Sequence, residues 1–501
     1  MPFFWIKGQE KKSANETTQN VSPSAQEASA TGATVMETQI GPEESAMIAN
    51  AVPYHELPAE VTEAQGNVFV EGGEKSFRNM TLWDTSLVLI TNQVGLGILS
   101  LPGIMHILGL VPGIIAIVGL GILTTYTGFV LLQLYRKYPN CVNIVDMGKV
   151  VGGRPLEIIV AAGLMIKICL TCASASVTLS VAFNTMSDHA LCTVVWIGIA
   201  AATCWLLCLP RTFKWVAHVG IPATLSIVAA VLIVLISLGV ADPKGAPPGF
   251  EKEIVLFGNP GFKQGLKACL NVAYAFAGNV GFPSLFPEMR NPSQDFFKGL
   301  VILQLFSVPL YLIVGVGIYC MAGQYTTSPA LGSAPVIPAK VAYGIVVPAV
   351  LATGLVFGHT AVKYMYVVIM RGLKSSNQMT DNSVKAWAVW VGSGTAFWIA
   401  AFVLANAIPI FDSILSISSA TFAAWFCFGI SGVFWLFLNW GRLFSTWHKV
   451  GLTILNVLII VQALFMNAAG LWAAITNLMD IFNRGEEGVR GPFTCADNSL
   501  F

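Results

Sequence analysis

The chain has 501 residues, of which 55% are hydrophobic and only 11% are charged. An ordinary soluble domain carries about 25% charged residues, so this composition indicates a polytopic membrane protein. The formal net charge of +1 gives no reason to expect nucleic acid or a strongly charged partner.

Residues 1–80 differ in composition from the rest of the chain. They are rich in Ser, Thr, Ala, Glu and Gln, and their apolar surface is too small to offset the entropy lost on ordering. We therefore expect a disordered cytosolic tail at 1–80, a transmembrane domain at 81–480 and a short non-cytosolic tail at 481–501.

Apolar runs of about 20 residues predict transmembrane helices, and the sequence contains eleven such runs. They lie at 83–107, 109–134, 156–183, 191–209, 215–240, 265–286, 297–321, 341–370, 385–407, 411–438 and 449–475. Lys and Arg gather in alternate short loops, which places the N-terminus in the cytosol and the C-terminus on the other side. The expected fold is an all-α integral membrane protein embedded in the lipid bilayer.

The first and sixth predicted spans are interrupted by Gly and Pro. Span one contains TNQVGLGILSLPG at 91–103, and span six contains AFAGNVGFP at 275–283. Irregular backbone at membrane depth is tolerated where protein or a water-filled cavity surrounds it. Interruptions at corresponding positions predict an inverted repeat of helices one to five and six to ten, with helix eleven added. The alternative is that the glycines serve only close helix packing.

Two broken helices expose backbone groups that suit an amino acid. A half-helix presents free amides and a partial positive charge at its start, and free carbonyls at its finish. The amides of Leu96, Gly97 and Ile98 would receive the carboxylate, and carbonyls near Tyr274 and Phe276 would accept the ammonium. Glycine at these points lets the ligand approach the peptide groups.

Aromatic side chains in the sixth span predict the character of the substrate pocket. Tyr274, Phe276 and Phe282 would form apolar walls that favour neutral substrates over charged ones. The other substrate-binding residues expected in the two interruptions are Gly95, Ala277, Gly278 and Asn279.

The two interrupted stretches carry a resemblance to a known family. VGLGILSLP at 94–102 and AYAFAGNVGFPSLFPEMRNP at 273–292 resemble the first- and sixth-helix motifs of the amino acid/auxin permeases, especially the fungal neutral amino-acid transporters. The resemblance covers roughly 80–475, and it implies the five-plus-five inverted-repeat fold and secondary active uptake. Where some relatives have His after the sixth-helix Gly, this chain has Asn279.

The resemblance also bears on the coupling ion, because family members couple to sodium or to protons. It places the sodium-binding oxygens near Thr91 or Asn92 on helix one and near Thr360 on helix eight. Helix eight reads GHTAVKYMY at 358–366, so His359 and Lys363 lie beside Thr360. An ammonium group at Lys363 would fill the space of a sodium ion, unless it extends to the cytosolic interface. His359 is the weaker candidate, with a structural role as its alternative.

Lys167, within GLMIKICL at 163–170, is a second candidate for proton coupling. An ionisable side chain inside a membrane helix is costly, and burial favours the neutral form of lysine, which allows proton exchange. The alternative is a structural role in which the ammonium donates to backbone carbonyls.

The cysteines give little indication of a functional role. Most of the ten lie inside apolar runs and are expected to be small buried side chains. Cys192, Cys320 and Cys495 lie near the predicted non-cytosolic face, where a disulfide would be permitted, but the sequence does not select a pair.

The sequence thus predicts a proton-coupled importer of neutral aliphatic or aromatic amino acids. The alternatives are a sodium-coupled symporter and an amino-acid-sensing receptor that signals through its N-terminal tail. The sequence contains no phosphate loop, metal-ligand cluster or nucleophile–base pattern, so we expect no enzyme activity, cofactor or metal. We expect the plasma membrane, with the vacuolar membrane as the alternative.

Overall fold

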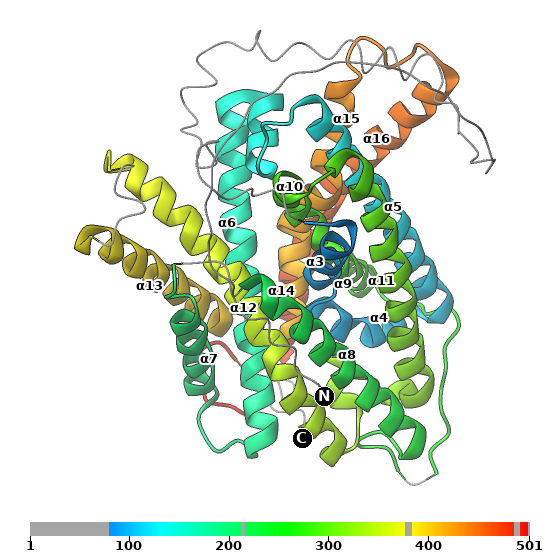
Figure 1. Ribbon diagram of the computed structural model, residues 1–501. Coiled ribbons are helices and arrows are strands. Elements are labelled where there is room, and N and C mark those ends of the chain that lie inside the picture. Colours follow the sequence, from blue (N-terminus) through cyan, green and yellow to red (C-terminus); the bar gives the residue numbers. More distant parts are fainter. Residues whose placement is uncertain (1–79, 212–215, 248, 376–382, 485–490, 499–501) are drawn as a thin grey trace, which may run out of the picture. The chain divides into compact units, whose positions relative to one another are not determined.

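The computed structural model describes residues 80–211, 216–247, 249–375, 383–484 and 491–498 (Figure 1). Within these ranges the regular elements are helices, and the only β-type pairing is an isolated bridge between Met80 and Met289. Apart from Met80, the predicted N-terminal tail lies outside the described residues.

Eight helical segments of the described chain are long and apolar enough to cross a membrane, and the bent pair α3–α4 makes a ninth. The long helices are α5 (Leu110–Lys137), α6 (Ile144–Ser187), α8 (Val216–Val240), α11 (Pro292–Ala322), α12 (Val336–Gly372) and α13 (Val384–Ala407). Two further spans contain π-helical stretches: α14 (Phe411–Ser418), η8 (Ser419–Gly429) and α15 (Ile430–Leu438), then α16 (Trp447–Phe465), η9 (Met466–Gly470) and α17 (Leu471–Arg484).

Two of the eleven predicted spans correspond to shorter helices. The fourth is α7 (Thr193–Leu207), with 15 residues, and the sixth is divided into short pieces. The number eleven therefore stays a prediction, whereas the all-helical architecture is confirmed.

The first predicted span is interrupted as expected. It consists of α3 (Leu82–Gln93), the 3₁₀ turn η1 (Leu96–Ser100) and α4 (Leu101–Leu108), with a bend of 44° between the helical parts. Thr81 caps α3, with its hydroxyl accepting from the amide of Asp84. Pro102 stands in the first turn of α4, where a helix needs no amide donor.

The sixth predicted span is interrupted in the same way. It consists of α9 (Phe262–Ala275), η3 (Ala277–Gly281), α10 (Phe282–Leu285) and η4 (Phe286–Glu288). Pro283 again stands in the first turn of the second half. Both interruptions are therefore confirmed.

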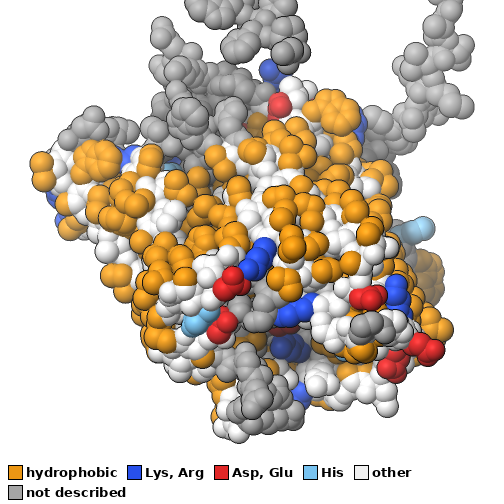
Figure 2. All heavy atoms as spheres, turned by 90° about the horizontal axis from the view of Figure 1, so that it is seen from below, with side chains coloured by type: hydrophobic (Ala, Val, Ile, Leu, Met, Phe, Trp, Pro, Cys, Tyr) orange, Lys and Arg blue, Asp and Glu red, His pale blue; other side chains and the backbone are white. Residues whose placement is uncertain are grey.

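The helices pack with the two interrupted spans inside the bundle. Helix α11 packs against α3, α4 and α5, and α12 packs against α6 and α8. Helix α9 contacts η1, α4, α14 and η8, so the two interruptions lie close to each other. Large apolar side chains remain exposed on the outer helix faces, among them Ile122, Ile159, Leu225 and Leu305, and hydrophobic side chains cover much of the surface in Figure 2. This distribution is that of a protein surrounded by lipid.

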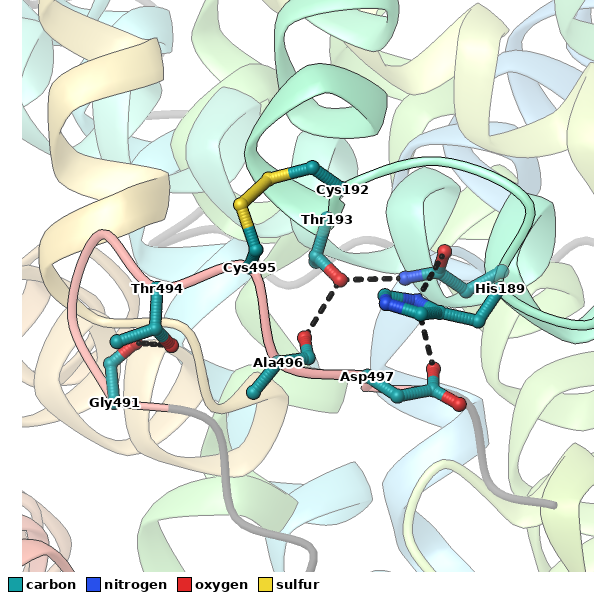
Figure 3. The surroundings of a disulfide bond; sticks show 9 residues. His189, Cys192, Thr193, Gly491, Thr494, Cys495, Ala496 and Asp497 are labelled. Carbon is teal, nitrogen blue, oxygen red and sulfur yellow. Dashed lines mark hydrogen bonds and ion pairs between the residues drawn. A yellow bond between two sulfur atoms is a disulfide. The ribbon is translucent and has the colours of Figure 1, made fainter.

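The C-terminal segment 491–498 is fastened to the α6–α7 connection (Figure 3). Cys192 and Cys495 form a disulfide, while Cys320 is a free thiol. The Thr193 hydroxyl donates to the Ala496 carbonyl at 2.7 Å. The structure thus selects one pair from the three cysteines that the sequence left open.

Candidate functional site

The two interruptions cross where glycine leaves no side chain between them. A Cβ atom on Gly97 would lie 2.5 Å from the Cα of Ala275, and one on Gly278 would lie 3.2 Å from the Cβ of Gln93. A Cβ on Gly95, by contrast, would meet nothing within 4 Å. Gly97 is therefore a packing glycine, whereas Gly95 faces open space.

The expected carboxylate-binding amides are partly free. In the described part of the chain, the amides of Leu96 and Gly97 donate to no acceptor, since they precede the first bonds of η1. The amide of Ile98 differs from the expectation, because it donates to the carbonyl of Gly95 at 3.3 Å. Two adjacent amides at the start of a half-helix, where the helix dipole is positive, form a site for an anion.

A small cavity of about 40 Å³ lies beside the first interruption. Its lining comes from the end of α3 and the start of η1, from α8 and from α12. The polar lining residues are Thr91, Asn92, Thr224 and Thr353, and Gly95 is also part of the wall. The volume admits an ion or a few waters, whereas pockets for small organic ligands measure about 300–1,000 Å³. In this conformation the cavity is too small for an amino acid.

Two of the six predicted coupling residues line this cavity, and the other four do not. Thr91 and Asn92 belong to the wall, and the polar α12 residue that reaches it is Thr353, two turns before Thr360. Thr360 and Lys363 are exposed, and the Thr360 hydroxyl donates to the carbonyl of Val356 at 2.7 Å. Thr353 was not predicted from the sequence, although its spacing of seven residues from Thr360 puts it on the same helix face.

His359 is buried and has a structural partner. Its Nε2 atom lies 2.9 Å from the carbonyl oxygen of Pro210, and its ring meets that of Trp390 edge-on at 5.3 Å. These contacts hold α12 against α13 and the chain after α7, which agrees with the structural alternative for this residue.

Lys167 is buried in the bundle, with only 3% of its side chain exposed. Its Nζ atom lies 5.6 Å from the centre of the Phe357 ring, and Phe357 lines the small cavity. Among the described residues, Lys167 forms no ion pair, and it is the only buried Asp, Glu, Lys or Arg. An ammonium without a counter-ion in the bundle interior is costly, which makes it a candidate for a functional group.

Asn279 lies fully buried in the second interruption and holds it to the neighbouring helices. Its Nδ2 atom donates to the Thr127 hydroxyl at 2.7 Å and to the Thr124 carbonyl at 3.1 Å. Gln304 of α11 donates to the Thr124 hydroxyl at 3.1 Å, so the network continues to a further helix. The oxygen of the Asn279 amide has no partner among the described residues.

The aromatic residues of the sixth span do not line the small cavity. Phe276 is buried with its ring edge-on to Tyr311 at 5.2 Å, and Phe282 is buried against Phe296 at 5.7 Å. Tyr274 and Ala277 are half-buried, and Tyr274 lies beside Thr171 of α6. Their role as pocket walls stays a prediction.

Known proteins resemble this chain over most of its length. Residues 78–476 match the family of transmembrane amino acid transporter proteins. The N amino acid transport system protein of Neurospora crassa is 30% identical over 428 residues, 85% of this chain and 90% of that protein. The amino acid transporter AVT1H of Arabidopsis thaliana is 25% identical over 380 residues, 73% of this chain and 84% of that protein. The chain therefore belongs to the transmembrane amino acid transporter family and is a transporter rather than an enzyme.

Proposed function

We propose that this protein imports neutral amino acids by secondary active transport, with alternating access at the two interrupted helices. The observation that carries the proposal is the crossing at Gly97 and Ala275. The unused amides of Leu96 and Gly97 suit the substrate carboxylate, and the carbonyls that end α3 and α9 suit its ammonium. The name of the Neurospora relative supports the amino acid as substrate.

The charge inside the bundle disfavours substrates with a cationic side chain. Lys167 is the only buried Asp, Glu, Lys or Arg among the described residues, so a cationic side chain would meet no carboxylate there. An anionic side chain would need to approach Lys167 itself. Burying a cationic side chain without a partner costs about 3–5 kcal/mol.

The proposed architecture has eleven spans, with helices one to five and six to ten as inverted repeats. Matching interruptions in the first and sixth spans support this arrangement. An odd number of spans puts the termini on opposite sides of the membrane. The disulfide at Cys495 supports a C-terminus in an oxidising compartment, outside the cell or in the vacuole, and hence a cytosolic N-terminus.

Protons are the proposed coupling ion, with Lys167 as the group that binds and releases them. Phe357 connects this lysine to the cavity next to the first interruption, so its charge can respond to the state of the site. Sodium coupling is the alternative, and the oxygens of Thr91, Asn92, Thr224 and Thr353 around that cavity favour it.

Uptake into proteoliposomes tests both the proposed transport and the proposed proton coupling through Lys167. Labelled neutral amino acids are offered with an inward proton gradient or an inward sodium gradient. We expect accumulation with the proton gradient, lost in Lys167→Met, which keeps the length of the side chain without its charge. Lys363→Met is the matched control, because Lys363 is exposed on α12.

Each other outcome changes a different part of the proposal. Proton-driven uptake that persists in Lys167→Met would overturn the role of this lysine alone. Accumulation with sodium only would assign coupling to the oxygen-lined cavity. No accumulation under either gradient would contradict the transport proposal itself.

A further inference from the structure

One hydroxyl group connects the two interrupted helices. Tyr311 of α11 is fully buried, and its hydroxyl oxygen lies 2.9 Å from the carbonyl oxygen of Gln93 and 2.9 Å from that of Ala275. Gln93 is the last residue of α3, and Ala275 is the last residue of α9. The hydroxyl thus lies where the negative ends of both half-helices converge.

Hydrogen-bond donors are too few at this point. A tyrosine hydroxyl has one proton and can donate to only one of the two carbonyls at a time. The Gln93 carbonyl also accepts from the Gly95 amide at 3.0 Å, and the Ala275 carbonyl is the second acceptor of the Tyr311 hydroxyl. The side-chain oxygen of Gln93 is buried without any partner in the described chain. Two carbonyl acceptors therefore share one hydroxyl proton.

The neighbouring side chains hold this arrangement in place. Ser307, one turn before Tyr311, accepts from the side-chain Nε2 of Gln93 at 2.9 Å. The ring of Phe276 stands edge-on to Tyr311 at 5.2 Å. These contacts place the Tyr311 hydroxyl between the two helix ends in this conformation.

We propose that Tyr311 is a positioning residue that occupies the ammonium subsite while the transporter is empty and gives it up when substrate binds. This rests on the proposed function, in which carbonyls at the helix ends accept the substrate ammonium. An ammonium nitrogen between the two carbonyls would take the position of the hydroxyl, and its three protons allow it to donate to both carbonyls at once. Substrate binding then breaks the link between α11 and the two half-helices, which frees these elements to move.

The exchange predicts a gain of affinity when the hydroxyl is removed. In Tyr311→Phe the ring and its contact with Phe276 remain, but substrate no longer breaks a hydrogen bond on entry. Binding of L-leucine to the purified full-length protein should tighten about two- to tenfold, the factor for one hydrogen bond. The KM for uptake should fall by a similar factor, because the empty state loses a hydrogen bond that the substrate-bound state does not have.

Tyr319→Phe is the matched control. Tyr319 lies on the same helix, is equally buried, and accepts from the Val255 amide at 2.9 Å, away from the interruptions. Unchanged or weaker binding in Tyr311→Phe would overturn the inference, and so would equal tightening in both variants. Wild-type protein that binds none of the twenty amino acids would overturn the proposed function and this inference with it.

A second measurement serves if Tyr311→Phe fails to fold. 3-Fluorotyrosine placed at position 311 of the otherwise unchanged chain reports the hydrogen bonding of this hydroxyl by fluorine NMR. Its signal should move when L-leucine is added, while the same probe at position 319 should not respond. A signal at 311 that stays in place under saturating L-leucine would contradict the exchange.

Discussion

Glycine is needed at positions 95 and 97 for different physical reasons. Gly97 lies against the backbone of Ala275, so even a methyl group would push the two interrupted helices apart. Gly95 has free space at its Cβ position and forms part of the cavity wall. The same residue type therefore serves packing at one position and an open site at the other.

Alanine substitutions separate these two roles. Gly97→Ala should destabilise the protein by about 1–3 kcal/mol, the usual cost of an added group in a tightly packed interior, and abolish uptake. Gly95→Ala should leave the melting temperature unchanged, because its methyl group meets no atom, but should reduce uptake by filling part of the cavity. Thermal unfolding of both variants in detergent, with uptake in parallel, provides the comparison. Equal destabilisation by the two variants would contradict the distinction.

At the scale of single elements, the end of the sixth span is linked to two others near the predicted cytosolic face. Met80, before α3, pairs with Met289 through backbone hydrogen bonds to Glu288 and Arg290. Lys363 of α12 lies close enough to Glu288 to favour its carboxylate. Both interrupted spans and α12 are therefore connected at this end.

The Glu288 carboxyl makes this connection sensitive to pH. Partial burial raises the pKa of Glu288, and the positive charge of Lys363 opposes that increase. A raised pKa means that the folded state binds the proton more tightly, so stability falls as the pH rises from the ordinary range of glutamate through the raised value. Lys363→Ala should raise the pKa further and extend this fall to higher pH. Melting temperatures between pH 4 and 7 test this for wild type, Lys363→Ala and Glu288→Gln, and Glu288→Gln should remove the part of the dependence that comes from this carboxyl. Identical pH profiles for wild type and Lys363→Ala would contradict the link.

Elements differ in how well the sequence predicts them. The interruptions near Gly95 and Gly278 were predictable, because Gly and Pro in an apolar run have a direct effect on the backbone. Tyr311 was not predicted, since a tyrosine in an apolar helix shows its function only when its hydroxyl meets carbonyls from elements 36 and 218 residues away. Thr353 was missed for a similar reason, because hydroxyl residues are ordinary in membrane helices and only the fold shows which one reaches a cavity.

At the scale of the whole molecule, the C-terminal segment 491–498 is bound to α6, α7 and the connection between them (Figure 3). The disulfide joins residues 303 positions apart. Around it, His189 lies 3.4 Å from the Asp497 carboxylate, and Asn498 donates to the hydroxyl of Ser180 at 3.0 Å. The sequence placed Cys192 and Cys495 on one face of the membrane, but the pairing depends on the path of the segment after α17.

Cys495→Ser therefore tests whether the disulfide between Cys192 and Cys495 stabilises the fold. Without the cross-link the C-terminal segment keeps only its hydrogen bonds and the contact between Asp497 and His189, and its detachment gains conformational entropy. Loss of a native disulfide costs typically about 2–4 kcal/mol, so the melting temperature should fall, and a C-terminal epitope should become sensitive to protease. Cys320→Ser is the control, because Cys320 is a free thiol and should change neither property. Uptake should persist in both variants, since the interrupted helices take no bond from residues 491–498. A C-terminus that stays protected in Cys495→Ser would show that the hydrogen bonds alone are sufficient to hold it.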